Sequence, residues 1–191
     1  MQILQRLSEE GDSEELVRLG TELFRNGEEQ KAFEYYRAAC KLGNATAMGN
    51  LGFCYQSGRG VKADLRMAAY CFERASELDD AGSMLKLGDF FYHGKGGIPK
   101  DRPRAYGYYL RAYEIETASS EPNFRQISSL CYRLGICKKD GQGTEPNFER
   151  AYEYLQEAAE AVSEYAEYDD PTAENLLERI QTAMNECEIH F

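Results

Sequence analysis

The residues most able to carry covalent or metal chemistry are two histidines and six cysteines. Neither His93 nor His190 stands in an H-E-x-x-H pattern, and no two cysteines have the C-x-x-C spacing that lets a pair of ligands reach one metal ion. No motif gathers a nucleophile, a base and an acid. We therefore expect no catalytic residue, no metal site, no cofactor and no enzyme activity.

The cysteines suit packing better than chemistry. They are Cys40, Cys54, Cys71, Cys131, Cys137 and Cys187. The chain starts without the apolar stretch of a signal peptide, so we expect reduced thiols. Cys54 and Cys137 each lie two residues after the glycine of a Leu-Gly pair, and we interpret that position as a small buried packing site.

A glycine-rich stretch at Gly94, Gly96 and Gly97 has a superficial likeness to a phosphate-binding loop. Such a loop follows a strand and places a lysine at a fixed position before a helix. Here the preceding residues have a helical pattern and the required spacing is absent. We interpret the stretch as a turn between two helices.

The charge of the chain is concentrated near its C-terminus. The net charge is −11, and residues 145–191, with 13 acidic and 2 basic side chains, account for all of it. A neutral body with an acidic end lacks the basic footprint that phosphate groups require, which argues against nucleic acid and membrane surfaces as partners. Basic residues gather around the glycine-rich turns, where we expect them to be solvated. They are Arg59, Lys62, Arg66, Lys95, Lys100, Arg102 and Arg104.

Helices must position all of these residues. Valine, isoleucine and threonine, which strands favour, together number only 16 of 191 residues. A Leu-Gly pair occurs four times, with its glycine at Gly20, Gly52, Gly88 and Gly135. After each pair, two alanines flank a bulky residue at spacing i, i+4, i+7, which places all three on one helical stripe. The stripes are Ala32-Tyr36-Ala39, Ala68-Phe72-Ala75, Ala105-Tyr109-Ala112 and Ala151-Leu155-Ala158.

The connections between the helices carry their own signals. Gly58, Gly94 and Gly141 suit the left-handed residue that ends a helix. Asp64, Asp101 and Asn147 each precede a stripe alanine by four residues, where the N-cap of the second helix belongs. The sequence therefore predicts a series of helix, glycine turn and helix.

At this point the chain resembles a known family. Residues 46–81 are similar to a Sel-1-like repeat, on Leu51, Gly52, Tyr55, Gly58, Gly60, Val61, Asp64, Ala68, Phe72 and Ala75. Two later units follow the same pattern, except that Phe91 replaces the tyrosine and that Lys138 and Thr144 depart from it. Residues 13–45 resemble the shorter tetratricopeptide repeat. The resemblance implies an all-α, right-handed α-solenoid of antiparallel helix pairs that binds other proteins.

We expect one repeat domain over residues 1–191, with a capping helix at its C-terminal end. Its parts are a lead-in (1–12), a tetratricopeptide-like unit (13–45), Sel-1-like units (46–81, 82–116 and 125–168), an inserted junction (117–124) and the capping helix (169–191). The junction is read as a loop or an extended helix end. Helical character should continue to about Tyr168, and Asp170 with Pro171 should start the capping helix.

The candidate binding surface lies on the first helix of each unit. In tetratricopeptide-like solenoids the residues one and four positions after the glycine line a concave groove, which suits docking of an extended segment or an amphipathic helix. The alternative is that some of these residues contact the next unit or the capping helix. The candidates at these positions are Phe24, Phe53, Gln56, Asp89, Tyr92, Ile136 and Lys139, and Tyr132 joins them because it lies upstream of Gly135 on the same helical face.

The resulting functional prediction is a non-enzymatic adaptor that binds another protein or a peptide segment in the bacterial cytoplasm. The alternative is an exported, disulfide-bonded repeat protein that binds an extracellular or cell-wall ligand. For that case the resemblance implies a bridge within a unit, for which Cys54 and Cys71 are the best pair. Self-association, head to tail between basic turns and the acidic end, is a further open alternative.

Overall fold

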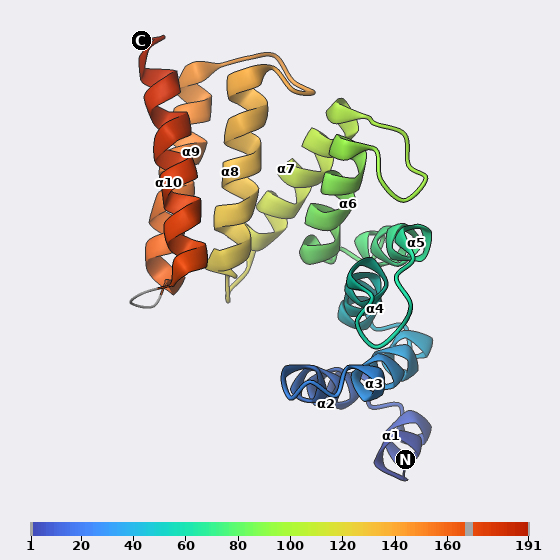
Figure 1. Ribbon diagram of the computed structural model, residues 1–191. Coiled ribbons are helices and arrows are strands. Elements are labelled where there is room, and N and C mark those ends of the chain that lie inside the picture. The colour runs from blue at the N-terminus through green and yellow to red at the C-terminus, as the bar shows by residue number, and fades with distance from the viewer. Residues whose placement is uncertain (1, 167–169, 191) are drawn as a thin grey trace. The chain divides into compact units, whose positions relative to one another are not determined.

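The computed structural model describes residues 2–166 and 170–190, and the regular secondary structure of this part of the chain is α-helix throughout (Figure 1). The helices are α1 (Gln2–Glu10), α2 (Ser13–Arg25), α3 (Glu29–Lys41), α4 (Ala45–Ser57), α5 (Leu65–Ser76), α6 (Ala81–His93), α7 (Arg102–Ala118), α8 (Phe124–Asp140), α9 (Phe148–Tyr165) and α10 (Pro171–Glu188). The expected all-α fold of sequentially paired helices is confirmed. The chain divides into two compact units, Met1–Lys100 and Asp101–Phe191, which are described separately.

In the first unit, α2 pairs with α3, α4 pairs with α5, and α6 packs on α5. The four stripe alanines of this unit have no solvent exposure, and the bulky residues between them, Tyr36 and Phe72, are buried. The Leu-Gly glycines face these rings. A Cβ atom on Gly20 would stand 2.8 Å from the Tyr36 ring, and one on Gly52 would stand 2.6 Å from the Phe72 ring. The repeat therefore needs glycine there because the partner helix inserts an aromatic ring at that point.

The glycine-rich turns of the first unit are packing elements. Gly58 ends α4 in the left-handed conformation, as predicted. Two residues later, Gly60 has a φ of +74°, and a Cβ there would lie 2.2 Å from the Glu29 carbonyl oxygen at the start of α3. Gly96 lies in the same way against the Leu65 carbonyl oxygen at the start of α5. Each turn thus packs against the second helix of the preceding pair. The backbones approach so closely at this point that only glycine fits.

The second unit uses the same devices. α8 packs against α7 and α9, and α10 packs mainly on α9. A Cβ on Gly135 would stand 2.8 Å from the Leu155 side chain, and one on Gly143 would stand 2.1 Å from the Arg102 carbonyl oxygen. Lys138, which departs from the repeat pattern, donates a hydrogen bond to the Thr144 hydroxyl at 2.8 Å.

Helix starts follow the predicted caps. The side chains of Asp64, Asp101, Asn147 and Asp170 each accept hydrogen bonds from backbone N–H groups in the first turn that follows. These four residues are therefore N-caps, and the capping helix begins at Pro171.

The sequence predicted the structure of three segments only in part. The lead-in is a helix, α1, whose Leu7 is 4% exposed. At the junction, α7 continues to Ala118 and a short loop then leads to α8, so both readings of the junction hold in part. The loop is fixed by Glu116, whose carboxylate accepts hydrogen bonds from the Asn123 backbone N–H and the Gln126 amide, both at 3.0 Å. α9 ends at Tyr165, and the expected continuation to Tyr168 lies outside the described residues.

Candidate partner-binding groove

Two of the candidate groove residues meet in the first unit. Phe24 on α2 and Phe53 on α4 have ring centroids 5.9 Å apart in an edge-to-face arrangement. Phe53 is 39% exposed, whereas Phe24 is half-buried. The pair is therefore an aromatic surface that two helices present together.

Arg59 holds this aromatic pair in place. Its guanidinium carbon lies 4.1 Å from the centroid of the Phe24 ring, and its Nε donates a hydrogen bond to Glu29 at 2.6 Å. The sequence prediction treated Arg59 as a solvated turn charge, but the structure shows it bridging the turn, the ring and the start of α3. A ring held by a guanidinium group and by a second ring loses less conformational freedom when a partner binds, which lowers the entropy cost of binding.

The other candidates of the first unit lie on α4 and α6. Gln56 is half-buried and follows Phe53 by three residues on the same helix. Asp89 and Tyr92, both half-buried, lie on α6. The Tyr92 ring is edge-on to the His93 ring, with centroids 5.0 Å apart. These residues add polar and aromatic groups to the first helices of the repeats.

In the second unit the corresponding face of α8 meets the capping helix. The Arg179 guanidinium of α10 lies 4.7 Å from the centroid of the Tyr132 ring and donates a hydrogen bond to its hydroxyl oxygen at 3.2 Å. Seven residues further along both helices, Lys139 pairs with Glu186 at 2.5 Å. Tyr132 and Lys139 thus contact the capping helix, which is the alternative to lining a groove, and Ile136 between them is half-buried.

The electrostatics of Lys139 reflect that contact. Burial by itself lowers the pKa of this amine, but hydrogen bonds to Glu186 and Asp140 outweigh burial, and the pKa stands above its ordinary value. The ammonium group is consequently charged at neutral pH and serves as a tether for α10.

The cysteines occupy packing positions, as expected. Cys54, Cys71, Cys131, Cys137 and Cys187 are buried and all six cysteines carry free thiols in this structure. Burial raises the pKa of Cys54 and of Cys71 to about 11 and the pKa of Cys137 to about 12. Since the thiolate is the nucleophile and the metal ligand, these thiols are poorly suited to either role at neutral pH. The Cys54–Cys71 bridge stays a prediction.

The histidines have aromatic neighbours. His190 stacks on Phe148, with centroids 3.9 Å apart and planes inclined by 13°, while His93 contacts Tyr92. Across residues 2–166 and 170–190, no cluster of three or more His, Cys, Asp or Glu side chains could hold a metal ion. In the same residues, no helix combines the length and the low polarity needed to cross a membrane.

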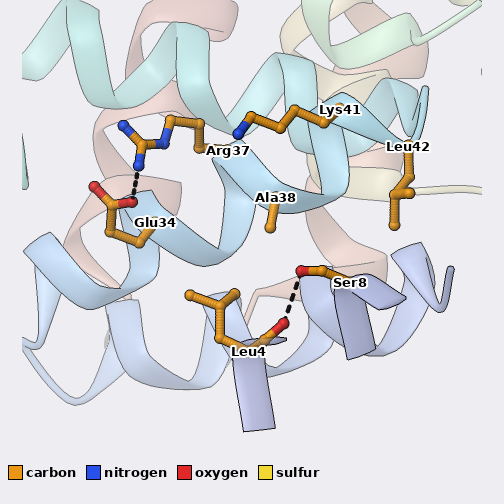
Figure 2. A pocket seen from close by; sticks show the side chains of 7 residues that line it. All are labelled: Leu4, Ser8, Glu34, Arg37, Ala38, Lys41 and Leu42. Atoms are coloured by element: carbon orange, nitrogen blue, oxygen red, sulfur yellow. Dashed lines mark hydrogen bonds and ion pairs between the residues drawn. The ribbon is translucent and has the colours of Figure 1, made fainter. Parts of the chain in front are cut away.

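A pocket of about 300 Å³ lies between α1 and α3 (Figure 2). Its polar groups are largely satisfied by one another. Arg37 forms an ion pair with Glu34, and the Ser8 hydroxyl donates a hydrogen bond to the Leu4 carbonyl oxygen at 2.7 Å, as Figure 2 shows. We interpret this pocket as the residual gap where the lead-in helix rests on α3.

Solved structures share the fold. A Sel1 repeat protein from Oxalobacter formigenes superposes with a TM-score of 0.66 at 22% identity, covering 95% of this chain and 79% of that one. A protective antigen of uropathogenic Escherichia coli strains that displays an SLR fold gives a TM-score of 0.68 at 23% identity, covering 95% of this chain and 40% of the antigen. At these identities the likeness establishes the fold alone.

Curated relatives are longer proteins. The ERAD-associated E3 ubiquitin-protein ligase component HRD3B of Arabidopsis thaliana is 31% identical over 103 residues, which are 54% of this chain and 17% of that protein. Chitin synthase regulatory factor 2 of Schizosaccharomyces pombe is 26% identical over 113 residues, which are 59% of this chain and 22% of that protein. The chain thus spans less than a quarter of the length of either relative.

The family itself is identified by the repeats. A model of the Sel1 repeat matches residues 16–44, 45–80, 81–115 and 128–163. The first match falls within residues 13–45, which were predicted from the sequence to form a tetratricopeptide-like unit, so this unit too is a Sel1 repeat, and the interval after residue 115 contains the inserted junction. Because the matched stretches span well over half of the sequence, the chain belongs to the Sel1 repeat family.

Proposed function

We propose that this protein is a non-catalytic interaction module that binds a segment of a partner protein on the first helices of its N-terminal repeats. Membership in the Sel1 repeat family supports this role. Two relatives are named as a component of an E3 ubiquitin-protein ligase and as a regulatory factor of chitin synthase, and these names agree with such a role.

The observation that carries the proposal is the Phe24–Phe53 surface. An aromatic side chain that is 39% exposed and braced by a second ring is the kind of residue that dominates binding energy at protein interfaces. Gln56, one turn after Phe53 on α4, would supply a hydrogen bond beside it, and Asp89 and Tyr92 occupy the corresponding positions on α6. Tyr132 and Lys139 already contact α10, so we place the partner on the first unit.

Affinity capture from the native host tests this assignment. We expect Phe53→Ala, alone or with Tyr92→Ala, to abolish capture of a partner that the wild-type protein retains. The matched control is Leu78→Ala, which removes a 52% exposed apolar side chain elsewhere in the same unit. Capture that survives the Phe53→Ala/Tyr92→Ala double variant would contradict the proposed surface.

We also propose a cytoplasmic setting, and the exported alternative has one specific observation in its favour. Cys54 and Cys71 belong to one core cluster, with Cys40 packed against it. Thiol titration of protein that is purified without reductant and then denatured separates the two cases. Six reactive thiols would support a cytoplasmic protein, whereas four would indicate a bridge and support export.

A further inference from the structure

The second unit contains an acidic pocket that the Phe24–Phe53 surface does not involve. It has a volume of about 330 Å³ and lies where the inserted junction meets α9. Its apolar part comes from Pro122, Phe124, Ile127 and Ala161, and Phe124 is 37% exposed. Along one edge α9 contributes three carboxylates at spacing i, i+3, i+7, namely Glu157, Glu160 and Glu164.

No cation of the described residues neutralises this pocket. Glu160 accepts a hydrogen bond from the neutral Gln156 amide at 3.1 Å, and Glu157 accepts from the Tyr113 hydroxyl at 2.8 Å. Burial and this carboxylate raise the pKa of Tyr113, so its hydroxyl stays a donor. Arg125, which follows Phe124 in sequence, instead stacks over Tyr165 and pairs with Asp170. The pocket therefore favours an occupant that is both basic and apolar.

The first unit carries a surface of that chemistry, which we call the basic face. On the first two turns of α5, the side chains of Leu65, Met67 and Tyr70 are 43%, 39% and 57% exposed. Arg66 lies between them, and its side chain passes 3.7 Å from the point where a Cβ on Gly97 would stand. The basic face is completed by Lys62 before α5 and Lys95 on the following turn.

The basic face also lacks compensating charge. Within the described residues, Lys62, Arg66 and Lys95 are exposed and form no ion pair. The nearby carboxylate of Asp64 accepts hydrogen bonds from the backbone N–H groups of Arg66 and Met67 as the cap of α5. The basic face thus combines exposed apolar side chains with cations that form no ion pair in the described part of the chain. The acidic pocket combines an apolar lining with carboxylates that form no ion pair with a described residue, so the two surfaces are complementary.

We propose that the acidic pocket of one copy of this protein receives the basic face of a second copy. Apolar contact would come from Met67 and Tyr70 against Phe124 and Ile127, and charge complementarity from Arg66 and Lys62 against Glu160 and Glu164. The two surfaces differ, so the contact is heterologous and each added copy leaves one of each kind free. Association is therefore head to tail and increases with concentration.

The strength of this contact follows from its size. Patches of a few side chains form small, weak interfaces, so we expect half-association at a concentration on the order of 100 µM. Sedimentation velocity of the wild-type protein should show a weight-average mass that rises with concentration and falls with added salt, because screening weakens exposed charge pairs. A mass that stays monomeric across this range would overturn the proposal and leave the pocket to a different occupant.

Charge reversal gives a sharper test. The variant Glu160→Lys/Glu164→Lys makes the pocket basic, and the variant Lys62→Glu/Arg66→Glu makes the basic face acidic. Each should associate with itself at least about tenfold more weakly than wild type, since like charges then face each other. Mixed together, they should regain association, with the two variants alternating, because the intact basic face of the first variant meets the intact pocket of the second and the two reversed surfaces are complementary to each other as well.

Controls separate this contact from general attraction between charges. The variant Glu114→Lys/Glu178→Lys changes the net charge equally at exposed positions outside the pocket, and it should associate like wild type. Equal loss of association in this control, or a mixture of the two reversal variants that stays monomeric while both remain helical by circular dichroism, would contradict the proposal. Phe53→Ala should leave association unchanged, so failure here is distinguishable from failure of the proposed function.

Discussion

The candidate binding face on the first helix of the repeat makes different contacts in the two units. In the first unit it presents the Phe24–Phe53 pair, and Phe53 is 39% exposed. In the second unit the equivalent face of α8 contacts the chain's own last helix through Tyr132 and Lys139. The comparison shows how one repeated face supplies both a docking surface and a terminal cap, according to which side chains occupy it.

The largest effect is expected from a substitution that weakens the packing of α10, the capping helix. Ile180 of α10 is 1% exposed, and Ile180→Ala should lower the free energy of unfolding by about 3 kcal/mol through lost burial and the cavity left behind. Urea denaturation measures the loss, and hydrogen exchange should rise in α10 while α2–α5 stay unchanged. The control Leu177→Ala, at a 37% exposed position of the same helix, should cost far less. Comparable losses would mean that α10 is not anchored by its buried face.

Both units contain a glycine turn that packs against the start of a helix, and these turns should contribute similarly to stability in the two units. Gly60→Ala and Gly143→Ala should each cost about 2 kcal/mol of stability, since both residues have positive φ and a Cβ would meet a carbonyl oxygen at 2.2 or 2.1 Å. Gly107→Ala is the control, because nothing lies within 4 Å of its added Cβ. It lies within α7 and should stabilise the protein by up to about 1 kcal/mol. Thermal unfolding of the three variants would show the contrast, and equal shifts would contradict it.

A smaller effect concerns the tether of the cap. Lys139→Met keeps the aliphatic stem but removes the ion pair with Glu186, and should cost about 1 kcal/mol because the lysine side chain is only 15% exposed. Arg74→Met in the first unit removes an exposed pair with Glu77 and should change stability by less than about 0.5 kcal/mol. Chemical denaturation of both variants compares the pairs, and equal costs would argue against a special role for Lys139.

The smallest predicted effect is a pH dependence confined to the cap. Backbone hydrogen bonds from Ala173 and Thr172 and the neighbouring Arg125 lower the pKa of Asp170. A carboxyl whose pKa is lower in the folded state stabilises the fold above its unfolded pKa, and this contribution is lost as the pH falls through the folded pKa. Exchange protection of the first turn of α10 should therefore decline with acidification below about pH 4. Asp170→Asn should flatten that decline, and an unchanged profile would contradict the assignment.

The repeat skeleton was predictable because it is local. The alanine stripes, the helix-ending glycines and the caps are set by spacing within one or two turns, and Ala68, Phe72 and Ala75 are buried as predicted. The helical nature of the lead-in was not predicted, because α1 depends on packing Leu7 against α2 and α3. Local pattern thus determined most of the architecture.

The candidate site was less accessible from sequence. Arg59 looked like a turn charge, and only the packing of the turn shows it over Phe24. The Tyr132–Arg179 contact joins residues 47 positions apart, which no repeat spacing reveals. The acidic pocket likewise depends on how the junction folds against α9.

The most direct test of the central claim is photo-crosslinking in the native host. A photoreactive phenylalanine analogue is placed at Phe53 in one variant and at Tyr132 in another. We expect a crosslinked partner from position 53 and only crosslinks within the chain, to α10, from position 132. A partner captured from position 132 and not from position 53 would contradict the account.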